Sequence, residues 1–280
     1  MKGQVAVVTG GNQGLGLALV RGLCHAFGDQ GVVYLAARNR ERGEAARQLL
    51  LAEGLSPQLA LLDVGHSGSV EELATTLHHE HGGVDVVISN AAARISPDLP
   101  ASAQVADFID TNNHGTCRMI EAFGPLLNDD ARFVVVASEF GSLRHLPERL
   151  HKRFDVSRLG LQDVEDLMDD YVSLVEDHRA AEQGWPEWIN IPSKVAQVAS
   201  MKVMARLMQA DATRRGILIN AACPGLIDTP ASQPWFTNMS GAQSPDEAGS
   251  DVVWLATLPD GRREPYGELV QHRRILPFDV

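Results

Sequence analysis

The fold is decided by one stretch near the start of the chain, Thr9-Gly10-Gly11-Asn12-Gln13-Gly14-Leu15-Gly16. The apolar run at residues 5–8 before it is typical of a short strand that is buried on both faces. After it, apolar residues recur at helical spacing over residues 17–23. The glycines therefore lie where a strand turns into a helix, which is the setting that a phosphate-binding loop requires.

The glycine spacing explains why a phosphate fits this turn. Gly10, Gly14 and Gly16 follow the pattern Gly-x-x-x-Gly-x-Gly. A residue without a Cβ permits the tight turn and lets the backbone approach a pyrophosphate. The free N–H groups and the positive dipole end of the following helix then face the negative charge of the ligand. The stretch predicts a dinucleotide site.

The composition is that of an ordinary folded domain. Hydrophobic residues make up 44% of the 280 positions and charged residues 21%, which suits a single domain over residues 1–280. The net charge of −12 argues against nucleic acid, because phosphate binding relies on clustered Lys and Arg. No apolar run could span a membrane, and residues 1–3 lead directly into a strand instead of a signal peptide. The cysteines have no CxxC spacing, so we expect a cytoplasmic protein without disulfides or metal.

Strands and helices alternate along the rest of the chain. The further predicted strands cover residues 31–37, 58–64, 84–89, 132–138, 216–222 and 267–270. The predicted helices between them cover residues 42–53, 67–81 (capped by Ser67 or Ser69), 103–127, 190–207 and 246–258. Such alternation implies right-handed crossovers, and therefore an α/β fold with a Rossmann-type doubly wound parallel sheet and helices on both faces.

The end of the second predicted strand bears on the choice of cofactor. In dinucleotide-binding folds an acidic residue at this point holds the ribose 2′-hydroxyl, whereas an Arg accommodates a 2′-phosphate. Here the strand runs into Arg38-Asn39-Arg40, with no acidic residue before Glu41. The simpler alternative is a solvated Arg at a strand end. The pattern favours NADPH over NADH.

The glycine pattern resembles that of the short-chain dehydrogenase/reductase superfamily, and residues 9–23 are most similar to its monomeric carbonyl reductase branch. Further motifs follow in the family's order. They are Asn112-x-x-Gly115-Thr116 within a helix, Ser138-x-x-Gly141 after the fifth strand, and Gly184-Trp185-Pro186, which is identical in that branch. The resemblance covers about residues 4–272.

The resemblance implies where NADP(H) binds. The family's Asn-Asn-Ala-Gly motif is here Ser89-Asn90-Ala91-Ala92, and its Pro-Gly turn past the nicotinamide follows the sixth strand. The implied cofactor contacts are Gly10, Asn12, Gln13, Gly14, Leu15, Gly16, Arg38, Asp63, Val64, Asn90, Ala91, Lys194, Pro224, Gly225 and Thr229.

The resemblance also implies a catalytic group in which one member has changed. Ser138 and Lys194 stand at family positions, and Asn112 matches the residue that kinks its helix and holds a water near the Lys. The superfamily's Tyr-x-x-x-Lys is here Asn190-x-x-x-Lys194, so the phenol that protonates the carbonyl oxygen is missing. The tyrosines of the chain, none an evident substitute, are Tyr34, Tyr171 and Tyr266.

An amide at this place changes the available chemistry. Asn190 can donate a hydrogen bond to an oxygen, but an amide has no usable pKa near neutrality and cannot act as a general acid. Losing acid catalysis typically costs about 10²–10⁴-fold in rate, so fast reduction of simple ketones is not expected. Alternatively, Asn190 serves only as a helix N-cap, a role in which Asn is favoured, with Pro192 in the first turn.

Two further segments set the substrate and the assembly. The branch carries a helical insertion at about residues 143–186 that covers the helix face through which other members form tetramers, so the resemblance implies a monomer. A flap at about residues 231–245 is rich in Gly, Ser, Pro and Trp. The candidate substrate contacts are Ser138, Trp188, Trp235 and Phe236.

Three functions remain open from the sequence. The first is an NADPH-dependent reductase of a substrate that needs little acid catalysis: a conjugated C=C bond, an imine that arrives protonated, or a ketone protonated through water or its own hydroxyl. The second is a non-redox cyclase or isomerase that keeps NADP(H) as structure. The third is a cofactor-binding protein without turnover. Ser138 and Lys194 favour the first two, because a sensor needs neither beyond ribose binding.

The position of Arg38 yields the first testable prediction. Arg38→Ala should weaken NADPH binding and leave NADH binding nearly unchanged, because only NADPH carries the 2′-phosphate. Titration of the purified variant with each cofactor measures both affinities. An equal loss for the two cofactors would contradict the assignment.

Overall fold

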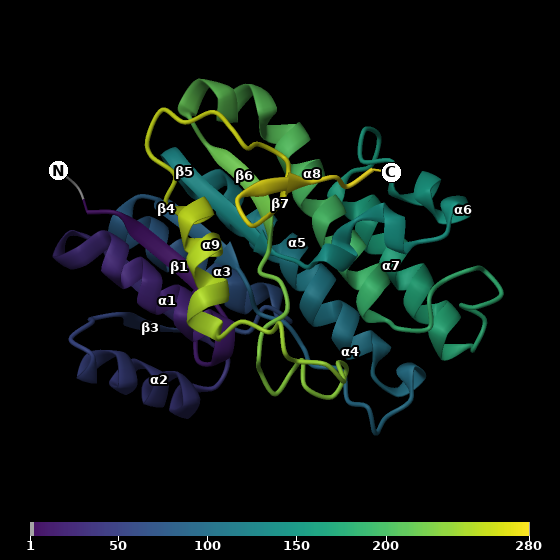
Figure 1. The fold of residues 1–280 in the computed structure, drawn as a ribbon. Coiled ribbons are helices and arrows are strands. Elements are labelled where there is room, and N and C mark those ends of the chain that lie inside the picture. Colours follow the sequence, from purple (N-terminus) through teal and green to yellow (C-terminus); the bar gives the residue numbers. More distant parts are fainter. Residues whose placement is uncertain (1–2, 280) are drawn as a thin grey trace.

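An eight-stranded sheet forms the centre of the computed structural model, which describes residues 3–279 (Figure 1). The expected start at Met1 and Lys2 lies outside the described residues. The sheet order is β3-β2-β1-β4-β5-β6-β7-β8. The strands are β1 (Val5–Thr9), β2 (Val32–Ala37), β3 (Gln58–Leu61), β4 (Val84–Ser89), β5 (Leu127–Val136), β6 (Leu218–Cys223), β7 (Leu269–Gln271) and β8 (Arg274–Leu276).

The helices follow the predicted alternation with the strands. They are α1 (Gly14–Phe27), α2 (Arg40–Ala52), α3 (Ser67–His81), α4 (Val105–Ile109), α5 (Gly115–Phe123), α6 (Glu148–His151), α7 (Leu161–Glu176), α8 (Asn190–Arg215) and α9 (Pro245–Ala256). In the part of the chain that the structure describes, no helix is long and apolar enough to cross a membrane.

The first strand fixes where a ligand can bind. β1 is buried along its whole length, as its apolar sequence predicts. It pairs in parallel with β2 on one side and with β4 on the other, so the connections diverge beside it. In open α/β sheets, ligands bind at this switch point, outside the carboxyl ends of the strands. The glycine turn after Thr9 opens there.

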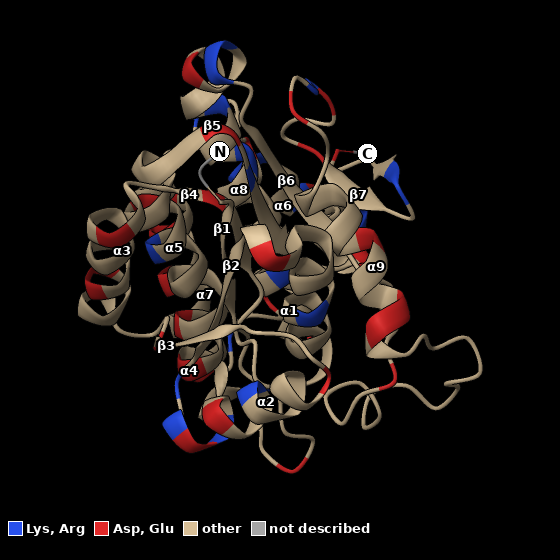
Figure 2. Cartoon of the chain, turned by 90° about the vertical axis from the view of Figure 1, so that its left-hand side faces the viewer, with Lys and Arg blue, Asp and Glu red and all other residues tan. Residues whose placement is uncertain are grey.

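Two helical layers enclose the sheet, which confirms the predicted fold class. Figure 2 shows α3, α4 and α5 on one side of the strands and α1 and α9 on the other. The buried apolar side chains accordingly form two clusters, one beneath α1, α2 and α9 and one beneath α3, α4, α5, α7 and α8. Asp and Glu residues are prominent on α3 and α9 (Figure 2).

The helix predicted over residues 103–127 is interrupted. A π turn, Asp110–His114, separates α4 from α5, and the chain enters β5 at Leu127, five residues before the predicted start. Pro125 lies in the short 3-10 turn between α5 and β5, where it cannot continue the helical hydrogen bonds. Asn112 lies within the π turn, and π turns are a common cause of the helix kink that the resemblance implies at this residue.

Two local predictions were wrong. The residue that caps α3 is His66, without a side-chain cap bond, and Ser69 instead accepts a hydrogen bond from the backbone N–H of Asp63 at 3.0 Å. The strand β8 was missed, and it makes the edge of the sheet antiparallel. Its two-residue turn, His272-Arg273, has φ of 49° and 61°, a conformation usually signalled by Asn or Gly.

The insertion before α8 builds a small core of its own. The rings of Tyr171 and Trp185 lie 4.7 Å apart, and Phe154 packs edge-on to Trp185 at 6.2 Å. The α7 helix of this insertion packs against α8 and α4. The insertion is therefore helical, as its sequence pattern predicts, and packs against the rest of the domain.

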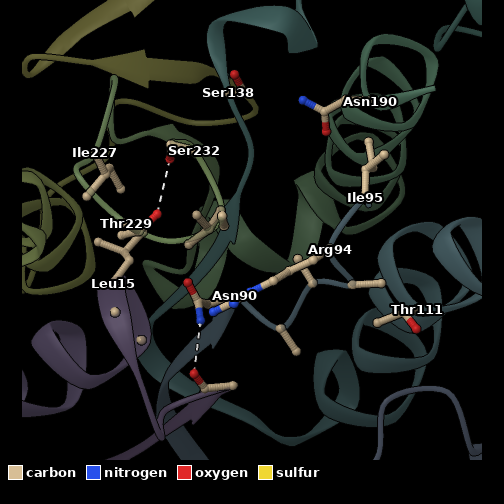
Figure 3. A pocket seen from close by; sticks show the side chains of 18 of the residues that line it. Leu15, Asn90, Arg94, Ile95, Thr111, Ser138, Asn190, Ile227, Thr229 and Ser232 are labelled. Carbon is tan, nitrogen blue, oxygen red and sulfur yellow. Dashed lines mark hydrogen bonds between the residues drawn. The ribbon is translucent and has the colours of Figure 1, made fainter. Parts of the chain in front are cut away.

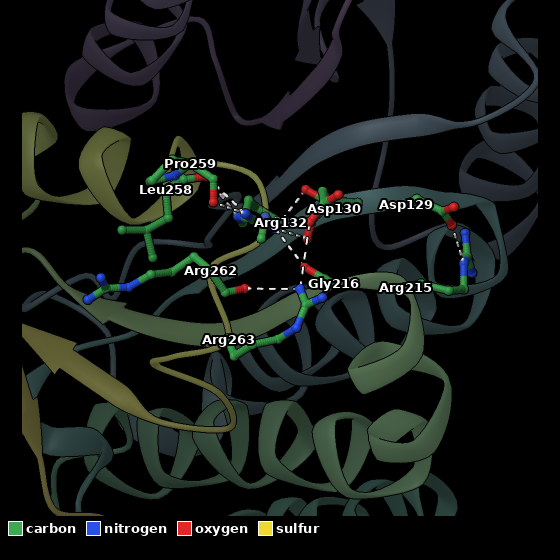
Figure 4. A network of polar contacts seen from close by, with 11 residues as sticks. Asp129, Asp130, Arg132, Arg215, Gly216, Leu258, Pro259, Arg262 and Arg263 are labelled. Atoms are coloured by element: carbon green, nitrogen blue, oxygen red, sulfur yellow. Dashed lines mark hydrogen bonds and ion pairs between the residues drawn. The ribbon is translucent and has the colours of Figure 1, made fainter.

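At the opposite end of the strands, a buried arginine closes the sheet. Figure 4 shows the guanidinium of Arg132 surrounded by backbone carbonyls. It donates to the carbonyls of Leu258 at 2.9 Å, Pro259 at 2.8 Å and Gly216 at 2.9 Å, so buried acceptors that would otherwise lose water are paired. At this end of the strands the protein's own groups satisfy one another, whereas the end with the glycine turn opens into a cleft.

Candidate active site

A cleft of about 880 Å³ lies at the carboxyl ends of the strands. Its size is that of a cofactor or small-molecule site. It is lined by nearly all the predicted site residues: Gly10, Asn12, Gln13, Gly14, Leu15, Gly16, Arg38, Asp63, Val64, Asn90, Ala91, Ser138, Trp188, Asn190, Lys194, Gly225, Thr229, Trp235 and Phe236. Asn112 and Pro224 are the predicted residues that do not line it.

One end of the cleft has the features of a phosphate site. Gln13 precedes α1 without a side-chain cap bond, so the first N–H groups of the helix are left for a ligand. Gly14 has φ of +51°, and a Cβ on Gly16 would lie 2.1 Å from the carbonyl oxygen of Gly10. The turn therefore requires glycine at both positions, and the residues present fit a dinucleotide phosphate.

Two arginines at this end lie where a second phosphate could be held. Arg38 and Arg42 both line the cleft, together with Asn39. The side chain of Arg38 is 75% exposed, and its nearest carboxylate, Asp63, is 4.0 Å away. Its charge is therefore weakly engaged and available to an anion.

A hydrogen-bonded clasp joins the ends of β1 and β4 beneath the cleft. The hydroxyl of Thr9 accepts from the backbone N–H groups of Asn90 at 2.9 Å and Ala91 at 2.8 Å. The side-chain amide of Asn90 donates back to the carbonyl of Thr9 at 2.8 Å. The clasp fixes the glycine turn relative to the β4 end, which puts Asn90 on the cleft wall (Figure 3).

Ser138 and Asn190 come together at the other end of the cleft. Ser138 follows β5 and accepts a 3.3 Å hydrogen bond from the backbone N–H of Phe140, which leaves its own hydroxyl hydrogen free to donate. Asn190 is the first residue of α8, and Figure 3 shows its amide on the side that faces Ser138. Within residues 3–279 the side chain of Asn190 makes no hydrogen bond, so both the oxygen and the NH₂ of its amide are available to a ligand.

The helix-cap interpretation of Asn190 is wrong. The residue before the helix is Ile189, with helical dihedrals of −60° and −17°, and it makes no side-chain cap bond. Asn190 already lies inside the first turn, where its side chain bonds no backbone N–H of α8. The side chain of Asn190 therefore does not cap α8, which is the role that the sequence pattern suggested.

Lys194 lies one turn further along α8, at the floor of the cleft. Its ammonium donates to the side-chain oxygen of Gln197 at 2.7 Å and to the carbonyl of Val136 at 3.4 Å. Burial lowers the pKa of Lys194 to about 8, against a weaker opposing effect of Cys223. The lysine is therefore mostly charged at neutral pH but titrates within a measurable range.

Asn112 supports the site from behind its wall. Its side-chain oxygen accepts from the backbone N–H of Ala93 at 2.8 Å, and its backbone carbonyl accepts from the hydroxyl of Thr116 at 2.6 Å. Its side-chain nitrogen is buried and has no partner among the described residues. Asn112 thus holds the segment after β4 and does not reach the cleft.

Aromatic rings from three segments form the wall beside Asn190. The ring of Trp188 lies 5.2 Å from Phe140, 5.8 Å from Trp235 and 6.2 Å from Phe236. These contacts join the turn after β5, the short segment between the insertion and α8, and the flap. The predicted substrate residues are therefore brought together, in a mainly apolar surface that would favour a small organic molecule.

None of the described tyrosines lines this cleft. Tyr171 is fully buried in the insertion, where burial raises its pKa. Tyr266 donates to the carbonyl of Ala205 at 2.6 Å. Tyr34 is half-buried and donates to a carboxylate oxygen of Glu80 at 3.0 Å. Within residues 3–279, no phenol lines the cleft where it could protonate a substrate.

Several lining residues were not predicted. Glu139 and Phe140 lie inside the Ser138-x-x-Gly141 motif, and Arg42 lies two residues after Arg40, so their place in the chain could have identified them. No sequence pattern distinguishes Arg94. It lines the cleft because the segment after β4 runs along the cleft wall (Figure 3). Gln197, which holds Lys194, could have been found from its position three residues later on the same helix face.

Comparison with known proteins places these features in a family. A family model described as short chain dehydrogenase matches residues 4–148. Carbonyl reductase (NADPH) 1 of Mus musculus is 34% identical over 278 residues, which cover 98% of each chain. Carbonyl reductase (NADPH) 3 of Rattus norvegicus is 33% identical over 274 residues, or 96% of each chain.

Solved structures share the fold at lower identity. The salutaridine reductase of Papaver somniferum superposes with a TM-score of 0.79 at 22% identity, covering 95% of this chain and 99% of that one. The menthone neomenthol reductase of Mentha piperita gives a TM-score of 0.77 at 24% identity, with 97% and 99% covered.

The free side chain of Asn190 yields a stability prediction. Asn190→Ala should change the free energy of unfolding by less than about 0.5 kcal/mol, because no cap bond is lost. The matched control is Asn39→Ala, since Asn39 caps α2 by accepting from the N–H of Arg42 at 2.9 Å; it should cost about 1 kcal/mol. Denaturant unfolding of the cofactor-free variants measures both. A cost at Asn190 equal to that at Asn39 would mean that the side chain serves the helix.

Proposed function

The chain belongs to the short-chain dehydrogenase family, and from that premise we propose which reaction its cleft performs. It is an NADPH-dependent oxidoreductase of the carbonyl reductase type. We propose that its substrate is a small molecule with a conjugated or protonated double bond, whose reduction does not depend on a protein acid. The observation that carries this proposal is the free amide of Asn190 opposite Ser138, in a cleft that no described tyrosine lines.

The residues of the cleft suit NADPH in particular. We propose that the glycine turn and the α1 N-terminus hold the pyrophosphate, and that Arg38 and Arg42 hold the 2′-phosphate. Lys194 also lines the cleft, and in this proposal it holds the nicotinamide ribose. When bound, NADPH supplies a hydride from its nicotinamide ring and leaves as NADP⁺.

The chain's own groups act on the substrate oxygen. In a conjugated carbonyl compound, hydride adds to the β-carbon and the electron pair of the C=C bond moves toward the oxygen. Asn190 and Ser138 both can donate a hydrogen bond to that oxygen as it gains negative charge. Water at the mouth of the cleft then gives a proton to the α-carbon, which completes the two-electron reduction. An imine that arrives protonated needs still less from the protein.

The need to protonate the oxygen explains why simple ketones are poor candidate substrates. A ketone oxygen must receive a proton as the alkoxide forms, and two hydrogen-bond donors without a suitable pKa stabilise the charge but do not neutralise it. Positioned acid catalysis is typically worth about 10²–10⁴-fold. The proposed site therefore favours substrates in which the charge is delocalised or already present.

We also propose that the protein works as a monomer. α7 of the insertion packs on α8, and it would occupy a surface that a partner subunit's α8 could otherwise use. Sedimentation at micromolar concentration tests this, and a tetramer would refute it.

Substitutions at Asn190 test the proposed chemistry. Asn190→Ala should abolish most native turnover, whereas Asn190→Tyr should raise reduction of quinones and activated ketones by about 10²-fold, because a phenol next to Lys194 acquires a lowered pKa. Asn190→Phe is the matched control, with the ring but no hydroxyl, and should not gain ketone reduction. Full native activity in Asn190→Ala would show that the amide has no part in the reaction.

A further inference from the structure

A chain of hydrogen bonds runs from Lys194 into the protein interior. Lys194 donates to the side-chain oxygen of Gln197 at 2.7 Å. The side-chain nitrogen of Gln197 donates to the hydroxyl of Thr116 at 3.1 Å, and this hydroxyl donates to the backbone carbonyl of Asn112 at 2.6 Å. Gln197 is 2% exposed and Thr116 is 2% exposed. The chain is therefore shielded from water at Gln197 and Thr116, and only its Lys194 end faces the cleft.

The amide of Gln197 fits this chain in only one orientation. An ammonium has donors and no acceptor, so the atom that faces Lys194 must be the oxygen. The nitrogen then faces Thr116, whose single hydrogen is already directed at a backbone carbonyl and whose lone pairs are free to accept. A flipped amide would place two donors against each other at Lys194. Every donor in the chain thus points away from the cleft.

This arrangement determines what Lys194 offers to a ligand. Its ammonium carries three N–H groups, and the oxygens of Gln197 and Val136 take two of them. The third is left for the cleft that Lys194 lines. A neutral amine would have to withdraw from one of the buried acceptors to serve the cleft, so the two acceptors favour the charged form against the desolvation that opposes it.

We infer that Gln197 is a positioning residue that keeps Lys194 charged and aims one of its N–H groups into the cleft. The inference rests on the proposed function only for the identity of the ligand, NADPH. Gln197 is the stronger of the two acceptors. Its side-chain oxygen lies 2.7 Å from the Lys194 ammonium, whereas the carbonyl oxygen of Val136 lies 3.4 Å away.

The charged state of Lys194 in the cofactor-free protein tests the inference without any turnover. The pKa of Lys194 is about 8, and isotope-labelled lysine followed by NMR across pH reports its titration. Gln197→Met keeps the length of the side chain but removes the acceptor, so the midpoint should fall by about one pH unit or more. Gln197→Glu places a negative charge at the same distance, so the midpoint should rise.

Asn113→Leu is the matched structural control. Asn113 is a second buried amide that bridges the π turn to α8, donating to the carbonyl of Ser193 at 2.8 Å and accepting from its hydroxyl at 2.8 Å. It has no hydrogen bond to Lys194. Its replacement should destabilise the same helix contact and leave the Lys194 midpoint where it is. If Asn113→Leu moves the midpoint as far as Gln197→Met does, the role of Gln197 is only structural.

NADPH affinity gives the second readout. A neutral Lys194 loses its attraction for the anionic cofactor, so wild-type affinity should fall as pH rises through the lysine midpoint. With the midpoint one unit lower, Gln197→Met should bind NADPH roughly fivefold more weakly than wild type at pH 8 and about equally at pH 6. Gln197→Glu should hold its affinity to higher pH.

The outcomes separate the two proposals. Identical Lys194 midpoints in the wild type, Gln197→Met and Gln197→Glu would overturn the role of Gln197, whatever the enzyme reduces. Shifted midpoints in a protein that does not bind NADPH would uphold the role of Gln197 and refute the proposed function. If Gln197→Met does not fold, the upward shift in Gln197→Glu decides alone.

Discussion

The ammonium of Lys194 is the charge on which the chemistry of the cleft depends. It lies at the end of a hydrogen-bond chain that leads through Gln197 into the interior, and burial lowers its pKa to about 8, against a weaker opposing effect of Cys223. The sheet supplies the setting. Val136 ends β5, Asn112 lies in the π turn, and α8 brings Lys194 and Gln197 between them. Packing holds each of these elements in place, and together they leave one N–H group of Lys194 directed at the cleft.

Carboxamides flank this lysine on both sides. Asn190 lies one turn before it at the cleft, and Gln197 lies one turn after it in the interior. Amides accept and donate hydrogen bonds but have no useful pKa near neutrality. A site built in this way orients, polarises and holds charge, and it suits reactions in which the proton is supplied by water or by the substrate itself.

Much of this could be predicted from the sequence, because the signals are local. Glycine spacing, apolar strands and the position of Arg38 are short-range patterns. The sheet agrees with them, and the predicted glycines and Arg38 line one cleft. The rest depends on long-range packing. The hairpin to β8 turns through His272 and Arg273, which carry no turn signal. Arg94 enters the cleft through the path of a loop, and the pairing of Gln197 with Thr116 joins α8 to α5. A cap at Asn190 was suggested by residue type, and the helix begins one residue too early for it.

The central claim is that hydride adds to the β-carbon of a conjugated carbonyl substrate, while Asn190 only polarises the carbonyl oxygen. The most direct test is single-turnover reaction of the wild-type protein with NADPH deuterated at the transferable position and a simple enone, followed by NMR of the product. The account predicts deuterium at the β-carbon of a saturated ketone, with one NADP⁺ formed for each product molecule. A rearranged product without deuterium, or deuterium on the carbinol carbon of an allylic alcohol, would contradict it.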